Sequence, residues 1–148
     1  MSVDVFVAAK TLGEACGWRV PNLRMQKILY FAHLDYMGKY NERLIESPFE
    51  AWEYGPVQPA LFHKLKRFGA RYVRDVFFRE EPLTEGKEFD VLRSASELWS
   101  AETGVLVAFT YNKDGAWIRT CNKGMLGHTI PDKFIREEYD MLAGGAGS

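Results

Sequence analysis

The clearest pattern in the chain is a stretch from Asn22 to Met37 in which apolar side chains recur at helical spacing. They fall on two adjacent faces, with Met25, Leu29, Ala32 and Tyr36 on one face and Gln26, Tyr30, His33 and Met37 on the next. Asn22 is a favourable N-cap, and Gly38 stands just beyond the last turn. A helix that is apolar over most of its circumference is normally buried, so this segment predicts the central helix of the domain.

Further segments show the same helical period. They cover residues 3–16, 59–69, 89–99 and 131–142, with a shorter one at 104–110. The limits come from ordinary stop and start signals, because Gly17 and Gly69 follow two of these segments and Pro131 begins the last. The pattern therefore predicts five to six helices.

Residues 49–54 alternate in a way that predicts a strand. Glu50, Trp52 and Tyr54 share one side of this strand. Gly55-Pro56 follows, and proline fixes its own backbone angle and restricts the residue before it. We therefore expect this pair to end the strand and to form a stiff corner before the next helix.

The fold class follows from these elements: a mainly α (α+β) single domain with a small antiparallel β element. Two further apolar runs, at 73–78 and 117–121, are short enough to be additional strands of that element. The domain is predicted to span residues 1–143, and the small residues at 144–148 read as a flexible tail.

Composition narrows the functional classes. The chain of 148 residues is 47% hydrophobic with a net charge of -1, whereas non-specific nucleic-acid binders usually carry a basic excess. Two distant cysteines, without zinc-ligand spacing, suit a reducing cytoplasm. We see no signal peptide and no apolar run near the ~20 residues that a membrane helix needs. These features predict a cytoplasmic protein without a membrane partner.

Charge is segregated along the middle of the chain. Residues 63–79 contain six Lys or Arg and one acid, and residues 80–103 contain seven acids and two bases. One interpretation is that the two stretches pair across the surface. The other is a basic docking face formed by Lys64, Lys66, Arg67 and Arg71.

The sequence contains no motif with the spacing of a known catalytic, metal or cofactor site, so we expect neither a metal nor a cofactor. The chain lacks a Gly-rich phosphate loop, a GxSxG elbow and an HExxH motif. His33 and Asp35 would lie on different faces of a helix, so His33 is predicted to be a structural histidine. Glu50 and Glu53 lie on opposite faces of the predicted strand, which is unsuitable for paired acid and base chemistry.

Two motifs carry a family resemblance. The segment Asn22-Leu-x-x-Gln26-Lys27-x-Leu-Tyr30, followed by Glu50-Ala-Trp-x-Tyr-Gly-Pro-Val57, resembles the SocA-like Panacea antitoxin domain, also described as phage-associated and GepA-like. Weaker matches extend the resemblance over residues 4–140. The chain departs from the family pattern at Tyr111, where the family often has His, and at Ala116, where it often has Pro.

The resemblance implies the antitoxin of a bacterial toxin–antitoxin pair, which neutralises a cognate toxin by direct protein–protein binding. The SocA branch also implies a second role, as an adaptor that delivers the toxin to the ClpXP protease. Carried over residue by residue, the motif gives these candidate toxin-binding residues: Gln26, Lys27, Tyr30, Glu50, Trp52, Tyr54, Gly55, Pro56 and Trp117.

Two other functions compete with this one. The first is a DNA-binding autoregulator of the operon, which would use the basic stretch 64–79. The second is a small hydrolase that uses Glu50 or His63. We expect no enzyme, because a compact domain that lacks a catalytic constellation and is rich in Trp, Tyr and Arg is typical of a binding module.

Overall fold

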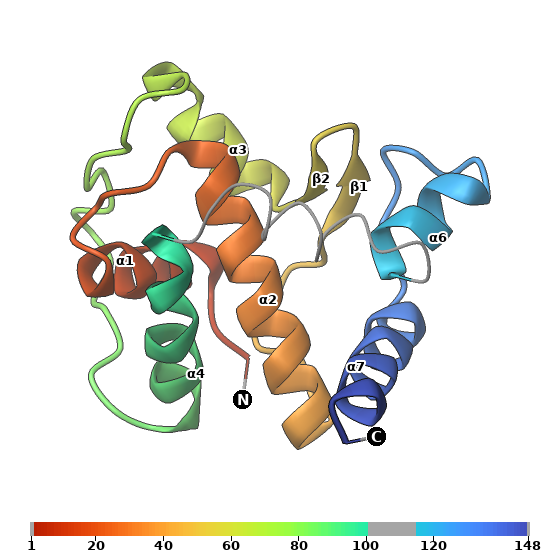
Figure 1. The fold of residues 1–148 in the computed structure, drawn as a ribbon. Coiled ribbons are helices and arrows are strands. Elements are labelled where there is room, and N and C mark those ends of the chain that lie inside the picture. The colour runs from red at the N-terminus through yellow and green to blue at the C-terminus, as the bar shows by residue number, and fades with distance from the viewer. Residues whose placement is uncertain (1, 101–114, 148) are drawn as a thin grey trace.

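The computed structural model describes residues 2–100 and 115–147, and it confirms the mainly helical class with one small antiparallel sheet (Figure 1). The helices are α1 (Val5–Ala15), α2 (Asn22–Tyr40), α3 (Pro59–Leu65), α4 (Lys87–Ser96), α6 (Ala116–Asn122) and α7 (Asp132–Gly147). Two 3₁₀ turns, Lys66–Phe68 and Glu97–Ser100, extend α3 and α4. The sheet consists of β1 (Glu50–Trp52) and β2 (Gly55–Val57).

Helix α2 crosses the middle of the molecule and forms the core with every other layer (Figure 1). Helices α1 and α4 pack on one side of it, and α7 and the β-hairpin lie on the other. Both predicted faces of α2 are buried, including the polar side chains of Gln26 and His33. The prediction of a central buried helix is therefore confirmed.

The limits of α1 and α3 agree with the stop signals in the sequence. Asp4 caps α1 by accepting hydrogen bonds from the N–H groups of Phe6 and Val7, and Gly17 follows its end with φ +65°. Helix α3 begins at Pro59, and Gly69 closes the 3₁₀ turn that continues it.

The predicted limits of α2 are wrong at both ends. Pro21 occupies the N-cap, and the Asn22 side chain instead donates a hydrogen bond to the carbonyl of Phe62 on α3. Helix α2 continues through Gly38 to Tyr40 and ends at Asn41, which has φ +55°. Gly38 serves close packing, because the Tyr139 ring of α7 occupies the position that a Cβ atom would take.

Residues 73–78 do not form the predicted strand. Val73 and Phe77 are buried four residues apart, and between them the chain is irregular. The Asp75 side chain accepts a hydrogen bond from the N–H of Phe77, which favours a turn over a strand. Only Tyr72 forms a β-bridge here, with Pro21.

The run at 117–121 is helical, not a strand, because it lies within α6. Short apolar runs fit either period, and the contacts of this one decide in favour of the helix. The Glu138 carboxylate accepts a hydrogen bond from the N–H of Ala116 in the first turn, where a negative charge stabilises a helix. The Thr120 hydroxyl donates to the carbonyl of Ala116 one turn back.

The remaining predictions concern the C-terminal half. Helix α4 runs from Lys87 to Ser96, close to the predicted 89–99, whereas the predicted helix at 104–110 lies outside the described residues. Pro131 precedes α7 rather than beginning it, and its carbonyl accepts from the N–H groups of Phe134 and Ile135. Helix α7 continues to Gly147, through the segment that was expected to be a tail.

Candidate functional site

The β-hairpin is held along both edges of its first strand. Ala51 pairs with Pro56 across the hairpin, while on the other edge the N–H of Ala51 donates to the carbonyl of His128 at 2.9 Å. The N–H of Ile130 also donates to the carbonyl of Phe49. The tip of the hairpin, Glu53 and Tyr54, thus projects from a strand that is fixed on both sides.

Gly55-Pro56 was expected to end the strand as a corner, but it forms the second strand of the hairpin. Because Ala51 directs its N–H away from β2, the Ala51–Pro56 pair is a non-hydrogen-bonded pair of the ladder. Proline fits such an edge position, since no donor is needed there. The Gly-Pro pair therefore shapes the hairpin, and both residues are buried.

Trp52 links the hairpin to its neighbours. Its indole N–H donates to the Glu50 carboxylate at 3.0 Å, which confirms that these two side chains share a side of the strand. Its carbonyl accepts from the indole N–H of Trp117 at 2.7 Å, and its ring packs edge-on against Phe62. Trp117 of α6 is thus a latch that holds the hairpin in place.

A buried chain of amides connects α2 to the hairpin. The Gln26 side chain donates to the Asn22 side chain at 3.1 Å and accepts from the N–H of Gln58 at 2.9 Å. Gln58 in turn exchanges hydrogen bonds with the side chain and carbonyl of Ser47. Gln26 therefore fixes the point where the hairpin enters α3.

A second buried contact connects α2 to α6 and α7. The Tyr30 hydroxyl donates to Glu138 at 2.7 Å, and the same carboxylate oxygen accepts from the N–H of Ala116 at 3.1 Å. Burial raises the pKa of both Tyr30 and Glu138. Tyr30 is 1% exposed, so it positions α6 instead of forming surface.

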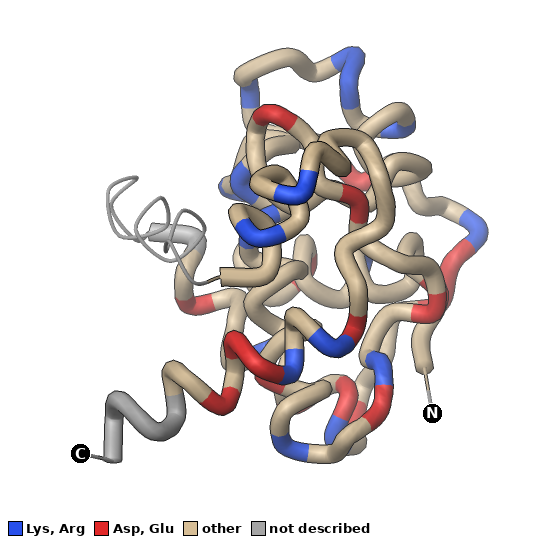
Figure 2. The backbone as a smooth tube through the Cα atoms, turned by 90° about the vertical axis from the view of Figure 1, so that its right-hand side faces the viewer, with Lys and Arg blue, Asp and Glu red and all other residues tan. Residues whose placement is uncertain are grey.

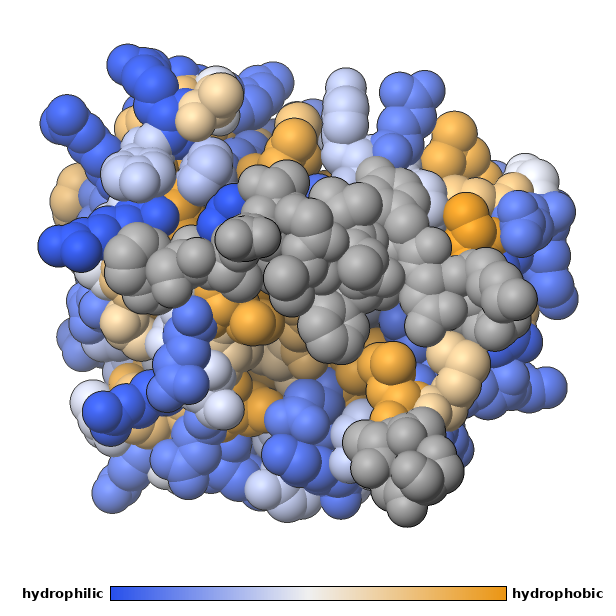
Figure 3. Space-filling view, in the orientation of Figure 1, coloured by the Kyte–Doolittle hydropathy of each residue, from blue (hydrophilic) through white to orange (hydrophobic). Residues whose placement is uncertain are grey.

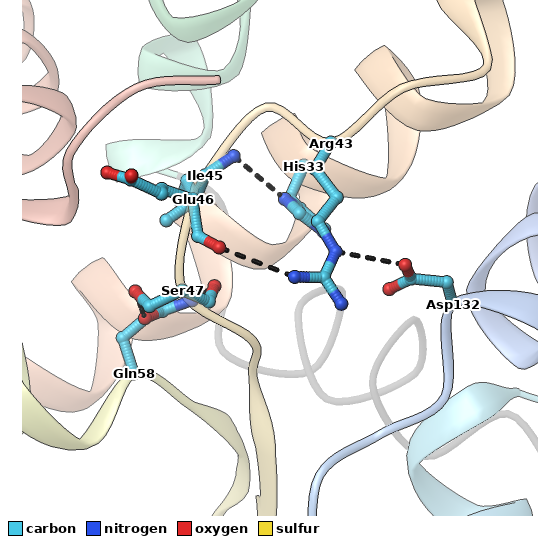
Figure 4. A network of polar contacts seen from close by, with 7 residues as sticks. All are labelled: His33, Arg43, Ile45, Glu46, Ser47, Gln58 and Asp132. Atoms are coloured by element: carbon cyan, nitrogen blue, oxygen red, sulfur yellow. Dashed lines mark hydrogen bonds and ion pairs between the residues drawn. The ribbon is translucent and has the colours of Figure 1, made fainter.

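His33 supports the loop after α2, and Figure 4 shows this network. Its Nδ1 accepts a hydrogen bond from the N–H of Ile45 at 3.2 Å, which requires an unprotonated nitrogen. Nearby, Arg43 forms an ion pair with Asp132 at 2.9 Å and donates to the carbonyl of Glu46. The prediction that His33 is structural is confirmed.

We expect His33 to make the protein sensitive to acid. Burial lowers its pKa from 6.5 to about 4. Between these two values His33 is protonated in the unfolded chain but neutral in the folded chain. The free energy of unfolding therefore falls as the pH decreases from 6.5 to about 4. The loss should reach roughly 3 kcal/mol, at about 1.4 kcal/mol per pKa unit. Urea unfolding across this range, compared with His33→Gln, measures it; equal slopes for the two proteins would contradict the assignment.

Beside these networks the hairpin tip exposes an apolar surface. Tyr54 is 51% exposed and Leu126, in the loop after α6, is 50% exposed. They line a shallow hollow of about 350 Å³ together with Trp52, Glu53 and Gly127. Figure 3 shows apolar side chains at the surface over α6 and the loop after it, at the upper right. We call the surface of Trp52, Tyr54 and Leu126 the hairpin-tip patch.

Comparison with known proteins identifies the family. The family model for the antitoxin SocA-like Panacea domain matches residues 25–118, well over half of the chain. The chain is also 30% identical, over 160 aligned residues, to antitoxin SocA of Caulobacter vibrioides (strain NA1000 / CB15N), an alignment that covers 93% of this chain and 83% of that protein. This chain belongs to the SocA-like Panacea antitoxin family. No solved structure matches it.

The motif residues of this Panacea domain divide into two groups. Gln26, Tyr30, Gly55, Pro56 and Trp117 are buried and hold the hairpin or the helices beside it. Glu50, Trp52 and Tyr54 lie wholly or partly at the surface. The motif therefore contains both residues that reach the surface and buried residues that hold them in position.

Lys27 belongs to neither group. It lies half-buried on the outer side of α2, where burial lowers its pKa and the neighbouring Arg24 charge lowers it further.

The Panacea domain also depends on two residues that the sequence analysis missed. Glu138 stands among Phe134, Ile135 and Leu142 on the apolar face of α7, and a carboxylate at such a position was the available signal. Gln58 stands between β2 and Pro59, where nothing in the local pattern marked it.

The four predicted basic residues lie on α3 and on the segment after it. The Lys64 ammonium lies over the rings of Phe6 and Phe77, and Arg71 donates to the carbonyls of Phe68 and Arg67. Lys66 and Arg67 are exposed. Among the described residues, no ion pair joins the stretch 63–79 to the acidic stretch that follows it, so the interpretation as paired surfaces is wrong for this part of the chain.

The hydrolase hypothesis gains no support from the geometry of Glu50 and His63. Glu50 accepts from Trp52, and His63 packs its ring against Trp52 and Phe62. Residues 2–100 and 115–147 contain no group of His, Cys, Asp and Glu that could hold a metal ion. No helix in the same part of the chain is long and apolar enough to cross a membrane.

Proposed function

We propose that this protein is the antitoxin of a toxin–antitoxin pair and that it neutralises its cognate toxin by binding it directly, without catalysis, through the hairpin-tip patch. Membership of an antitoxin family supports the role. The observation that carries the choice of surface is the exposed apolar patch that the family motif itself builds and supports. A cytoplasmic site of action, expected from the cysteine content, belongs to the same proposal.

The hairpin-tip patch has the properties of a protein-binding surface. Exposed Tyr and Trp supply large contact area with few rotatable bonds, and such residues dominate binding energies in protein interfaces. The patch is also held in place before binding, because β1 is hydrogen-bonded on both edges and Trp117 fixes Trp52. A preorganised surface loses less conformational entropy when a partner docks.

The buried motif residues contribute indirectly in this proposal. Gln26 fixes the entry of β2 into α3, and Tyr30 holds α6 through Glu138. Glu50 keeps the Trp52 ring in position. We therefore assign toxin contact to Trp52 and Tyr54 and a positioning role to Gln26, Tyr30, Glu50, Gly55, Pro56 and Trp117.

The double variant Tyr54→Ala/Leu126→Ala tests the surface. We expect toxin affinity to fall by about 30-fold, or about 2 kcal/mol, as for truncation of a central interface residue. The product of the neighbouring gene, which is the expected toxin, would be co-expressed and co-purified, and its affinity measured by calorimetry. A matched control is Tyr40→Ala/Leu23→Ala, which removes a tyrosine and a leucine that are 44% and 36% exposed on α2.

The outcomes of this experiment distinguish whether the protein binds the toxin at all from whether the hairpin-tip patch is the surface that does so. Loss of toxin binding in the patch variant, with binding retained in the α2 control and both proteins folded, supports the proposal. Full binding by both variants would overturn the choice of surface. Failure of the wild-type protein to bind the toxin or to rescue growth would overturn neutralisation by direct binding.

Delivery of the bound toxin to ClpXP is the second step of the proposed role, and it rests on the SocA resemblance. With purified ClpXP and ATP, we expect rapid degradation of the toxin only when the antitoxin is present, while the antitoxin itself survives many cycles. An unchanged toxin lifetime would remove the adaptor step and leave neutralisation by binding intact. The patch variant, which should bind the toxin about 30-fold more weakly, serves as the control.

The alternative function, a DNA-binding autoregulator that uses residues 64–79, is favoured by the unpaired basic side chains. The geometry argues against it, because these residues lie at the end of the seven-residue helix α3, on a 3₁₀ turn and on an irregular segment, and not on a helix long enough to read the major groove. A gel shift with the operon promoter at two salt concentrations tests it, since phosphate contacts make affinity fall with salt.

A further inference from the structure

The segment after α3 forms an apolar groove at one end of the molecule. Trp18, Phe68, Tyr72 and Val73 line it, and its volume is about 1030 Å³. The segment is pinned at two buried points: the N–H of Val73 donates to the carbonyl of Val20, and Phe77 stacks on Trp18 with ring centroids 6.1 Å apart. These two contacts fix the wall of the groove to the rest of the domain.

Its rim is basic. Arg71 and Arg74 border the groove itself, and Lys66, Arg67 and Arg79 stand on the same segment; all five are exposed. Figure 2 shows Lys and Arg gathered at the top of the view, whereas the acidic positions concentrate lower down. None of the five forms an ion pair with a described carboxylate, and the one acid of the segment, Asp75, pairs with Lys10 at 3.5 Å. The positive charge of the rim is thus uncompensated by the described chain.

The groove and the residues directly after it also carry backbone donors and exposed aromatic side chains. The N–H groups of Arg74, Asp75 and Val76 donate to no acceptor among residues 2–100 and 115–147. Tyr72 is 60% exposed and Phe78 is 82% exposed, so two large rings face solvent on the same segment. Free N–H groups beside a groove can receive the carbonyls of an added peptide chain.

We propose that this basic groove, defined by Trp18, Phe68 and residues 70–75, docks an acidic peptide segment of a partner protein. Carboxylates of the segment meet Arg71 and Arg74, an apolar side chain enters the space between Trp18 and Tyr72, and backbone carbonyls accept from the free N–H groups. This site is separate from the hairpin-tip patch and does not depend on the proposed function.

Charge complementarity and the apolar lining together favour a peptide over a nucleic acid. A surface that binds nucleic acid usually carries continuous positive charge along the path of the phosphates. On this segment Asp75 interrupts the run of Lys and Arg, and Glu80 and Glu81 follow it directly. The lining of Trp18, Phe68 and Val73 calls for an apolar anchor between the charges, which a peptide supplies and a phosphate backbone does not.

Fluorescence anisotropy with labelled synthetic peptides tests the proposal. The probes are peptides of about twelve residues, which extend to ~40 Å at ~3.3 Å per residue. Asp and Glu alternate with Leu or Phe in them, and the comparison peptides carry Lys in place of each acid. The variant Arg71→Glu/Arg74→Glu removes the rim charge. Lys133→Glu/Arg136→Glu is the matched control, because it changes the net charge equally at exposed positions on α7.

We expect the acidic peptides to bind the wild-type protein and the α7 control, the rim variant to bind at least about tenfold more weakly, and the Lys peptides not to bind. Amide shifts in NMR spectra should map to residues 68–79. Absence of acidic-peptide binding, or binding that the rim variant leaves unchanged, would overturn the proposal. Binding of a single-stranded oligonucleotide in place of the peptides, or self-association through the rim, would also overturn it.

Discussion

Replacing Glu138 with alanine is expected to lower the free energy of unfolding by about 4 kcal/mol, since each buried donor left without a partner costs about 1–3 kcal/mol. The substitution strands two such donors at once, the Tyr30 hydroxyl and the N–H of Ala116. It also removes the negative charge at the first turn of α6. Denaturant unfolding followed by circular dichroism measures the loss.

Glu138→Gln is the matched control. The glutamine oxygen can accept both hydrogen bonds, so this variant should lose about 1 kcal/mol or less. Tyr30→Phe, combined with each substitution, completes a double-mutant cycle that isolates the Tyr30–Glu138 contact. If Glu138→Ala and Glu138→Gln were equally stable, the carboxylate would not be the link between α2 and α6 that we describe.

The same residue gives a pH dependence of defined sign. Burial raises the folded-state pKa of Glu138 above its ordinary 4.5, so the folded chain holds this proton more tightly than the unfolded chain does. Its contribution to stability is complete below pH 4.5 and declines as the pH rises through the folded pKa. His33 acts in the opposite direction over the acid range. Glu138→Gln should abolish the decline and leave the His33 effect unchanged.

Replacing Trp117 with alanine should also cost about 4 kcal/mol, within the range measured for Trp to Ala in protein cores. Trp117 is buried in α6, and its indole N–H donates to the carbonyl of Trp52. Under the proposed role of the hairpin-tip patch, the variant should lose toxin affinity as well, because this contact positions Trp52. Thermal unfolding and calorimetry with the toxin measure the two effects.

Trp117→Phe distinguishes packing from the hydrogen bond. Phenylalanine keeps an aromatic ring but removes the indole N–H that donates to the Trp52 carbonyl, so we expect a loss of about 1–2 kcal/mol and most of the toxin affinity retained. A fully stable Trp117→Ala protein that binds toxin as the wild type does would refute the latch between α6 and the hairpin.

The local sequence pattern determined which segments are helices wherever the apolar period was long. The segment from Asn22 recurs over four turns, so only a buried helix satisfies it, and the caps at Asp4 and Gly17 depend on neighbouring residues alone. The sequence also predicted that Glu50 and Trp52 lie on the same side of the strand, because side chains alternate along any strand whatever packs against it. The family motif likewise pointed to the strand around Trp52 and to the helix that supports it, but not to Gly55–Val57 as a second strand.

Only the tertiary structure decided the features that depend on contacts between distant segments. Residues 117–121 are helical because Glu138 reaches the N–H of Ala116 from α7. Gly38 lies inside α2 because the Tyr139 ring fills the space above it. Residues 72–78 are irregular because Phe77 stacks on Trp18 and the N–H of Val73 donates to the carbonyl of Val20.

The division between buried and exposed motif residues also required the structure. In the sequence, Tyr30 and Tyr54 are two tyrosines of one motif, yet one is buried against Glu138 and the other is half exposed at the hairpin tip. Periodicity reports which side of an element a residue occupies, but burial depends on what the rest of the chain places against that side. The sequence by itself therefore determined the long helices and the family, and the packing of α6, α7 and the hairpin decided which motif residues are buried and which reach the surface.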